Sequence, residues 1–368
     1  MDKPKITNVK IRNLTLSMVL IALLVLISFL IKPLGLLNSF QQRVLNLCAI
    51  YAIIAISYNL VNGFTGMFSL GQAGFMAIGA YSVGIFTLPL AQRAQVFYMQ
   101  PMNPLISWIH MPLIAAMIVG GLLAAAAAFL VGFPVLRLKG DYLAIATLGF
   151  SEIIRIVLTN AQSFTNGALG IKSIPPIDSM GIMFSVLIIT VVVLGLFISS
   201  SYGRALKAIR EDEIAAESMG IGLLRHKLLA FMISAFFAGI GGGLYGALLG
   251  TVDPRNFMFT LTYNFLLMIV LGGLGSLSGS VIGAFIVTAG MEILRFFDNP
   301  LTVMGVNIPI FRPGLRMVVF SLLLLVVVLF WHHGIMGTRE ITWDSLLRFR
   351  KTARNLPKGK KPRAEGSQ

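Results

Sequence analysis

The sequence predicts an all-α membrane protein that crosses the bilayer about ten times. Hydrophobic residues make up 57% of the 368 residues and charged residues only 12%, and the mean hydropathy is +0.86. These values lie far outside the usual range of soluble domains. The apolar residues form separate runs, and about 20 apolar residues cross a hydrocarbon core of roughly 30 Å. The lysines and arginines gather in alternate loops and in the tails, as expected for a multi-pass protein.

We expect a transmembrane domain at residues 14–331, between an N-terminal tail at 1–13 and a basic tail at 332–368. The first run has no small-x-small cleavage site, which favours a retained helix over a secretory signal. The eighth run is short, so residues 258–297 form either two spans or a re-entrant hairpin. The predicted spans are residues 14–31, 44–61, 66–88, 112–132, 141–159, 182–198, 228–250, 258–272, 276–297 and 313–331.

The positions of the cations predict the orientation. If the N-terminus is cytoplasmic, 20 lysines and arginines fall on the cytoplasmic side and 6 on the other side. Because these cations are retained on the cytoplasmic side of membranes, we expect both termini in the cytoplasm and an even number of crossings. The net charge of +15 follows from this topology, so we expect no nucleic-acid partner. We expect the basic tail either to be disordered or to rest on anionic membrane lipid.

Small residues recur every fourth position in two of the runs. Helices in lipid associate through such residues because these let the backbones approach closely. The pattern therefore indicates a compact helical bundle, although a general richness of membrane helices in glycine and alanine is the alternative. The two stripes are Ala116, Gly120, Ala124, Ala128 and Gly132, and Ala235, Gly239, Gly243 and Ala247.

The longest cytoplasmic loop, residues 199–227, contains the amphipathic helical pattern GRALKAIREDEIAAESMGI. We predict one helix that stops near Gly220, since glycine favours a helix C-terminus. Glu213 and Glu217 lie one turn apart, and such a like-charge pair costs an isolated helix roughly 0.2–0.5 kcal/mol. A cationic partner is implied, either Arg210 in the same helix or a basic groove on another protein.

Two small side chains in this loop, Ala215 and Ala216, favour close approach of another surface. The segment resembles the E-A-A loop of ATP-binding cassette importer permeases, which docks into the ATPase subunit. The alternative is a solvated amphipathic helix. The resemblance implies that the ATPase-coupling residues are Arg210, Glu213, Ala215, Ala216, Glu217 and Gly220.

Three further stretches resemble the M-type permease subunit of importers for leucine, isoleucine and valine. They are NLVNGFTGMFSLGQAGFMAIGAY (59–81), RLKGDYLAIATLGFSEIIRIV (137–157) and the glycine-rich turn at 270–284. Together with the loop, they extend the resemblance from about residue 46 to residue 297. The resemblance implies a type II-like importer permease in the bacterial inner membrane.

Two groups of residues are candidates for the translocation pathway. Glu152 lies 11 residues after Asp141, roughly 16 Å along a helix, and Arg155 can pair with it at a spacing of three. Such a pair either borders the pathway or is a permanent structural ion pair. The glycine-rich stretch with Ser69 and Gln72 is the second group. Its half-helix N-terminus suits a substrate carboxylate, whereas tight packing around a short turn is the alternative.

The sequence contains no phosphate-binding loop and only one cysteine, so we expect no ATPase site, cofactor or metal site in this chain. The resemblance implies that two ATPase subunits bind ATP-Mg, that a periplasmic binding protein delivers branched-chain amino acids, and that a second homologous permease subunit completes the pathway. Within this interpretation, urea or short-chain amides are alternative substrates. An ion-coupled secondary transporter or channel is the alternative from another class, with Glu152 as its ion site.

Overall fold

The computed structural model describes residues 22–30, 35, 37–177, 179–298, 302–303, 306–307, 315–330, 334–337 and 339–340. Residues 22–30 are helical, and a short antiparallel pair is formed by β1 (Thr302–Val303) and β2 (Val306–Asn307). The remaining elements are α2 (Ser39–Asn59), η1 (Leu60–Phe64), α3 (Gln72–Thr87), α4 (Leu90–Val96), α5 (Leu113–Val135), α6 (Asp141–Asn160), α7 (Gln162–Thr165), η2 (Gly167–Leu169), α8 (Met180–Ser199), α9 (Ser201–Glu211), α10 (Glu213–Ser218), α11 (Leu223–Leu249), η3 (Pro254–Phe257), α12 (Phe259–Gly272), α13 (Leu277–Ile293), η4 (Leu294–Asp298) and α14 (Leu315–Phe330).

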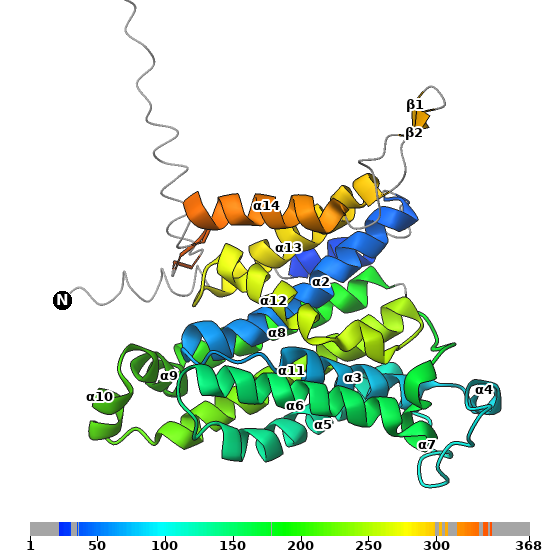
Figure 1. Cartoon of the computed structure of the whole chain (residues 1–368), viewed down its shortest axis with the longest axis horizontal. Coiled ribbons are helices and arrows are strands. Elements are labelled where there is room, and N and C mark those ends of the chain that lie inside the picture. The colour runs from blue at the N-terminus through cyan, green and yellow to red at the C-terminus, as the bar shows by residue number, and fades with distance from the viewer. Residues whose placement is uncertain are drawn as a thin grey trace, which may run out of the picture.

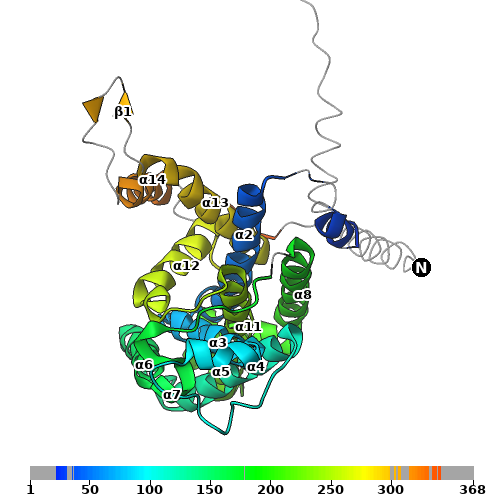
Figure 2. The same ribbon diagram turned by 90° about the vertical axis from the view of Figure 1, so that its right-hand side faces the viewer.

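The long helices lie side by side, with α9 and α10 at one end of the bundle and α4 and α7 at the other (Figure 1). We call these the α10 end and the α4 end. Viewed along the bundle, α3 and α11 lie near its centre, with α6 and α8 on opposite sides (Figure 2). The helices α2 and α11 are the most buried of the long helices, whereas α5, α6 and α8 present most of their surface outward. Lipid is the solvent that this apolar periphery requires.

Each predicted apolar run overlaps helical residues. In the part of the chain that the structure describes, five helices are long and apolar enough to cross a membrane, and α3 and α4 form a further pair bent by 119°. The third run differs from the prediction because its helix begins at Gln72, after a non-helical stretch at 65–71. The number of ten crossings and the cytoplasmic location of both termini stay predictions. The five long helices are Ser39–Phe64, Leu113–Val135, Asp141–Asn160, Met180–Ser199 and Leu223–Leu249.

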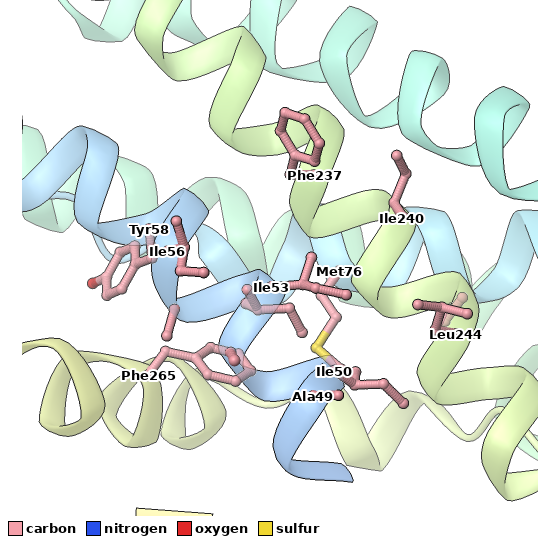
Figure 3. Close-up of a cluster of buried hydrophobic side chains, with 14 of the residues drawn as sticks. Ala49, Ile50, Ile53, Ile56, Tyr58, Met76, Phe237, Ile240, Leu244 and Phe265 are labelled. Carbon is pink, nitrogen blue, oxygen red and sulfur yellow. The ribbon is translucent and has the colours of Figure 1, made fainter. Parts of the chain in front are cut away.

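The core is built where α2, α3, α11 and α12 meet. Figure 3 shows isoleucines of α2, including Ile53, packed beside Met76 of α3, Leu244 of α11 and Phe265 of α12. Each of these four side chains is buried. Because a packed interior loses stability when even one methylene is removed, this cluster holds the four helices in one arrangement.

The small-residue stripes predicted from the sequence lie at the closest helix contacts. The whole stripe of α5 is buried, and a Cβ added to Gly239 of α11 would lie 3.0 Å from the carbonyl oxygen of Gly120. A second face of α11 approaches α3, where a Cβ on Gly242 would overlap the backbone of Met76. Glycine is required at both positions because the backbones are in contact.

The helices α12 and α13 form an antiparallel hairpin. Gly272 packs against Gly279, and Gly283 packs against Met268. The residues 273–276 form the turn, which lies at the α10 end (Figure 1). This turn is close to other glycine-rich segments of the chain and belongs to the site described below.

Candidate functional site

The segment between α8 and α11 folds as two helices, α9 and α10. The prediction of one continuous helix was wrong because Asp212 has extended backbone angles, φ −157° and ψ 114°. Its carboxylate accepts hydrogen bonds from the amides of Ile214 (2.8 Å) and Ala215 (3.0 Å) and so caps a new helix. At the other end of α10, Gly220 has φ +82°, which favours glycine and lets the chain turn back towards α11.

The two alanines of the E-A-A pattern point in different directions. Ala216 is buried against the protein, whereas Ala215 is exposed. Large apolar side chains are exposed beside Ala215, since Ile214 is 76% and Met219 84% accessible. The free face of α10 is therefore apolar, although α10 projects from the end of the bundle (Figure 1). We call Ile214, Ala215 and Met219 the outer face of α10.

The cationic partner of Glu213 is Lys227 of α11, not Arg210. The Lys227 ammonium lies 2.5 Å from the Glu213 carboxylate, and the lysine side chain is only 8% exposed. Arg210 instead donates to the carbonyl oxygen of Gly63 at 2.9 Å, and it pairs with Glu211 at 3.3 Å. The loop is thus fastened at two points, by α10 to α11 and by α9 to η1.

The contact of Arg210 extends to the turn between α12 and α13. A Cβ added to Gly275 would lie 2.8 Å from the Arg210 guanidinium, so this turn and η1 surround the same side chain. The Asn59 carboxamide joins the two segments, since it accepts from the Gly275 amide at 3.0 Å and donates to the Ser276 carbonyl oxygen at 2.9 Å. A single arginine of α9 therefore contacts two glycine-rich turns from distant parts of the sequence.

Residues of the predicted basic tail also reach this turn. The Glu340 carboxylate accepts from the amides of Leu277 (2.5 Å) and Ser278 (3.1 Å) at the start of α13. The amide of Met336 donates to the Gly272 carbonyl oxygen at 3.0 Å. The described residues 334–337 and 339–340 thus form part of the α10 end. The rest of the predicted tail and the N-terminal tail at 1–13 lie outside the described residues.

The pathway candidates Ser69 and Gln72 are both buried at the break between η1 and α3. Gln72 donates to the Ser57 hydroxyl at 3.0 Å, and the carbonyl oxygen of Ser69 accepts from the Tyr58 hydroxyl at 2.6 Å. The exposed amides expected here are occupied, because Leu70 donates to the hydroxyl of Thr147 and Ala73 to that of Thr262. In this conformation, the break is a hydrogen-bonded junction of α2, α3, α6, α11 and α12. The pathway role of Ser69 and Gln72 stays a prediction.

The other candidates, Glu152 and Arg155 of α6, form the predicted ion pair at 2.7 Å, with side chains 23–25% exposed. Glu152 also accepts from the amide of Phe259 at 3.2 Å. Phe259 begins α12, so the carboxylate lies at the positive end of that helix. The contact between Glu152 and the Phe259 amide was not predicted from the sequence, because no favoured capping residue marks the start of α12. The pathway role of the pair stays a prediction.

The α4 end is organised by one buried arginine, Arg93, which lies between the predicted spans 66–88 and 112–132. The guanidinium of Arg93 donates to the carbonyl oxygens of Ser107 (2.5 Å) and Ile109 (2.5 Å), among others. Burial lowers the pKa of this group from its ordinary value. Arg93 thereby holds the loop 97–111 against the end of α3.

Comparisons with known proteins agree with this architecture. Residues 41–329 match the family described as branched-chain amino acid transport system, permease component. The high-affinity branched-chain amino acid transport system permease protein LivM of Escherichia coli is 38% identical over 287 residues, which cover 69% of this chain and 63% of LivM. This chain thus spans less than two thirds of the length of that relative.

More distant relatives carry other names. The permease protein LivH of the same Escherichia coli transport system is 28% identical over 277 residues, covering 67% of this chain and 83% of LivH. The guanosine ABC transporter permease protein NupQ of Bacillus subtilis is 25% identical over 290 residues, covering 72% of this chain and 83% of NupQ. This chain is therefore similar in sequence to permeases that are named for different substrates.

Proposed function

This chain belongs to the family of branched-chain amino acid transport permease components, and we propose that it is a transmembrane permease subunit of an ATP-binding cassette importer that brings branched-chain amino acids into the cytoplasm. The match over residues 41–329 carries this proposal. The several apolar helices make the chain a multi-pass membrane protein, and we place it in the bacterial inner membrane with both termini in the cytoplasm. The energy then comes from ATP-Mg on partner subunits, since the chain itself has no phosphate-binding loop.

The partners that we propose are a second, homologous permease subunit, two ATPase subunits and a periplasmic substrate-binding protein. Similarity to both LivM and LivH supports a homologous second subunit. The outer face of α10 supports ATPase docking because Ile214 and Met219 are largely exposed at the end of the bundle. We assign Arg210 to the attachment of α9 to η1, Glu213, Ala216 and Gly220 to the support of α10, and Ala215 and Glu217 to contact with the ATPase.

Charge placed on the outer face of α10 tests the docking. We expect Ala215→Arg and Met219→Glu to release the ATPase subunits from the membrane fraction and to abolish ATP-dependent leucine uptake. Ser201→Arg is the matched control, because Ser201 is exposed in the same loop but lies outside α10. Full retention of the ATPase subunits in both α10 variants would contradict the proposal. Ala216 is unsuitable for this test since it is buried.

The ion pair of Glu152 and Arg155 is the observation that favours an ion-coupled transporter instead. That alternative predicts leucine accumulation in vesicles that contain the chain, a proton or sodium gradient and no ATPase subunit. The proposed function predicts no accumulation under those conditions. The same uptake assay with urea, short-chain amides and guanosine tests the substrate class.

A further inference from the structure

A cavity of about 220 Å³ opens near the α4 end between α2, α11 and α13. Its volume is below the roughly 300–1,000 Å³ of pockets that hold drug-sized ligands, so it suits a small metabolite. Charged side chains line one part of the cavity, and aliphatic and aromatic side chains line the rest. The residues that matter to the argument are Arg43, Leu47, Tyr51, Tyr245, Glu292 and Arg295.

The charged side chains that line the cavity form only one long ion pair with one another among the described residues. Glu292 and Arg295 approach to 3.6 Å, longer than the 2.7–2.9 Å of a charge-assisted hydrogen bond. The Glu292 side chain is nevertheless only 21% exposed. Arg43 is exposed near the start of α2 and interacts electrostatically with Tyr245. The cavity therefore offers a cation from α2 that has no carboxylate partner among the described residues, and a carboxylate from α13 whose ion pair with Arg295 is long.

Aromatic side chains close the inner side of the cavity. Tyr51 and Tyr245 stack with their ring centroids 6.0 Å apart, and Tyr51 meets Phe265 edge-on at 5.5 Å. Tyr51 follows Arg43 by eight residues, which places it roughly 12 Å deeper along α2. The cavity is therefore a site with a closed floor in this conformation, with its charges at the mouth and an aromatic surface at the bottom.

Two buried polar side chains lie on helices that also line the cavity. Asn46 of α2 and Thr288 of α13 have no hydrogen-bond partner among the described residues for their side-chain nitrogen or oxygen atoms. Contacts of Asn59 with Ser280 and of Cys48 with Phe285 join the same two helices. The interface of α2 and α13 thus contains buried polar groups, although Asn46 and Thr288 do not line the cavity.

We propose that this cavity is a binding site for a zwitterionic amino acid with a short aliphatic side chain. Arg43 binds the carboxylate, Glu292 binds the ammonium group, and Leu47 and Tyr51 contact the side chain. The two ion pairs would orient the bound amino acid, and the apolar walls would favour an aliphatic side chain. The choice of a branched-chain amino acid as occupant rests on the proposed function. A phosphoethanolamine lipid headgroup presents the same two charges, and the test separates it from the amino acid.

Equilibrium binding of radiolabelled L-leucine to the purified full chain in detergent tests this assignment. We expect saturable binding that weakens about tenfold or more in Arg43→Gln and in Glu292→Gln, because each change removes a hydrogen bond to a charged group. Arg255→Gln is the control, since Arg255 is an exposed cation at the same end of the bundle. Leucinamide, which lacks the carboxylate, should compete as well as leucine in Arg43→Gln but poorly in the wild-type chain.

Leucine binding within twofold of wild type in both charge variants would overturn the assignment, as would a folded wild-type chain that binds no leucine. If Arg43→Gln does not fold, Leu47→Trp fills the cavity from its uncharged wall and must abolish binding. A third result would also overturn the proposal and assign the site to lipid. In that case phosphatidylethanolamine copurifies with the wild-type chain but not with Arg43→Gln, and the wild-type chain binds no leucine after delipidation. ATP-driven leucine uptake by the complete wild-type transporter is measured separately. If the wild-type transporter shows no such uptake, the proposed function is refuted. Unchanged leucine binding in the variants refutes only the proposed binding site.

Discussion

Replacement of Arg210 by methionine tests whether α9 transmits motion to the bundle. Methionine keeps an unbranched side chain but removes the donor that reaches the Gly63 carbonyl oxygen at 2.9 Å. A hydrogen bond from a charged group contributes about 1.5–3 kcal/mol. The Arg210 side chain is 32% exposed, so solvent screening reduces this to roughly 1–2 kcal/mol, a factor of roughly 5–30 in an equilibrium.

We expect Arg210→Met to keep the ATPase subunits bound, because Arg210 faces η1 and not the outer face of α10. Leucine uptake per ATP hydrolysed should fall by about 5–30-fold in proteoliposomes that contain the complete transporter. Arg204→Met is the matched control in the same helix, since Arg204 is exposed and donates to the nearby Ser199 carbonyl oxygen and not to η1. An unchanged ratio of uptake to hydrolysis in Arg210→Met, or an equal fall in Arg204→Met, would refute this reasoning.

Three further predictions follow from contacts elsewhere in the bundle. Glu152→Gln should destabilise the chain by about 1–3 kcal/mol because it leaves Arg155 unpaired, and a second change, Arg155→Met, should recover most of that loss in thermal unfolding. Glu340→Gln should weaken the cap of α13 by about 0.5–2 kcal/mol and speed hydrogen exchange of amides in its first turn; unchanged exchange would contradict the contact. Gly79→Ala should prevent normal packing of α3 on α11 and reduce folded yield, since a Cβ there would overlap the Gly239 backbone, whereas Gly149→Ala, with open space around it, should have no effect.

The positions of the helices were predictable because lipid imposes a simple rule on composition. A run of apolar residues must form a helix to satisfy its backbone groups in a membrane, and each predicted run overlaps helical residues. The packing faces were predictable for a related reason. The four-residue spacing of Ala116, Gly120 and Ala124 marks one face of a helix, and that face is buried. The small residues that are regularly spaced in the sequence of α5 are therefore the residues that contact neighbouring helices.

The pair of Glu152 and Arg155 was predictable from its spacing of three, whereas charged side chains whose partners lie on another element were not. Glu213 pairs with Lys227 across the end of α11, and Arg210 reaches a backbone carbonyl oxygen 147 residues away. A signal for the break in the loop was present, because Asp212 is a favoured residue at a helix N-terminus. The helical spacing of the apolar residues on both sides of Asp212 nevertheless led to the prediction of one continuous helix. No pattern indicated the contact of Glu340 with α13, since it depends on where the chain returns after α14.

At the α10 end, hydrogen bonds to backbone groups link α9 to η1 at the end of α2, and link that segment to the turn between α12 and α13. Arg210 holds Gly63 at the end of η1, Asn59 joins η1 to Gly275, and Met336 joins the C-terminal residues to the same turn. A packed assembly of this kind transmits a displacement because it has few alternative arrangements. We infer that a movement of α9 reaches α2 and the hairpin of α12 and α13 together. Phe265 of α12 contacts Tyr51 at the floor of the cavity, so the hairpin that meets the α10 end also packs against the cavity.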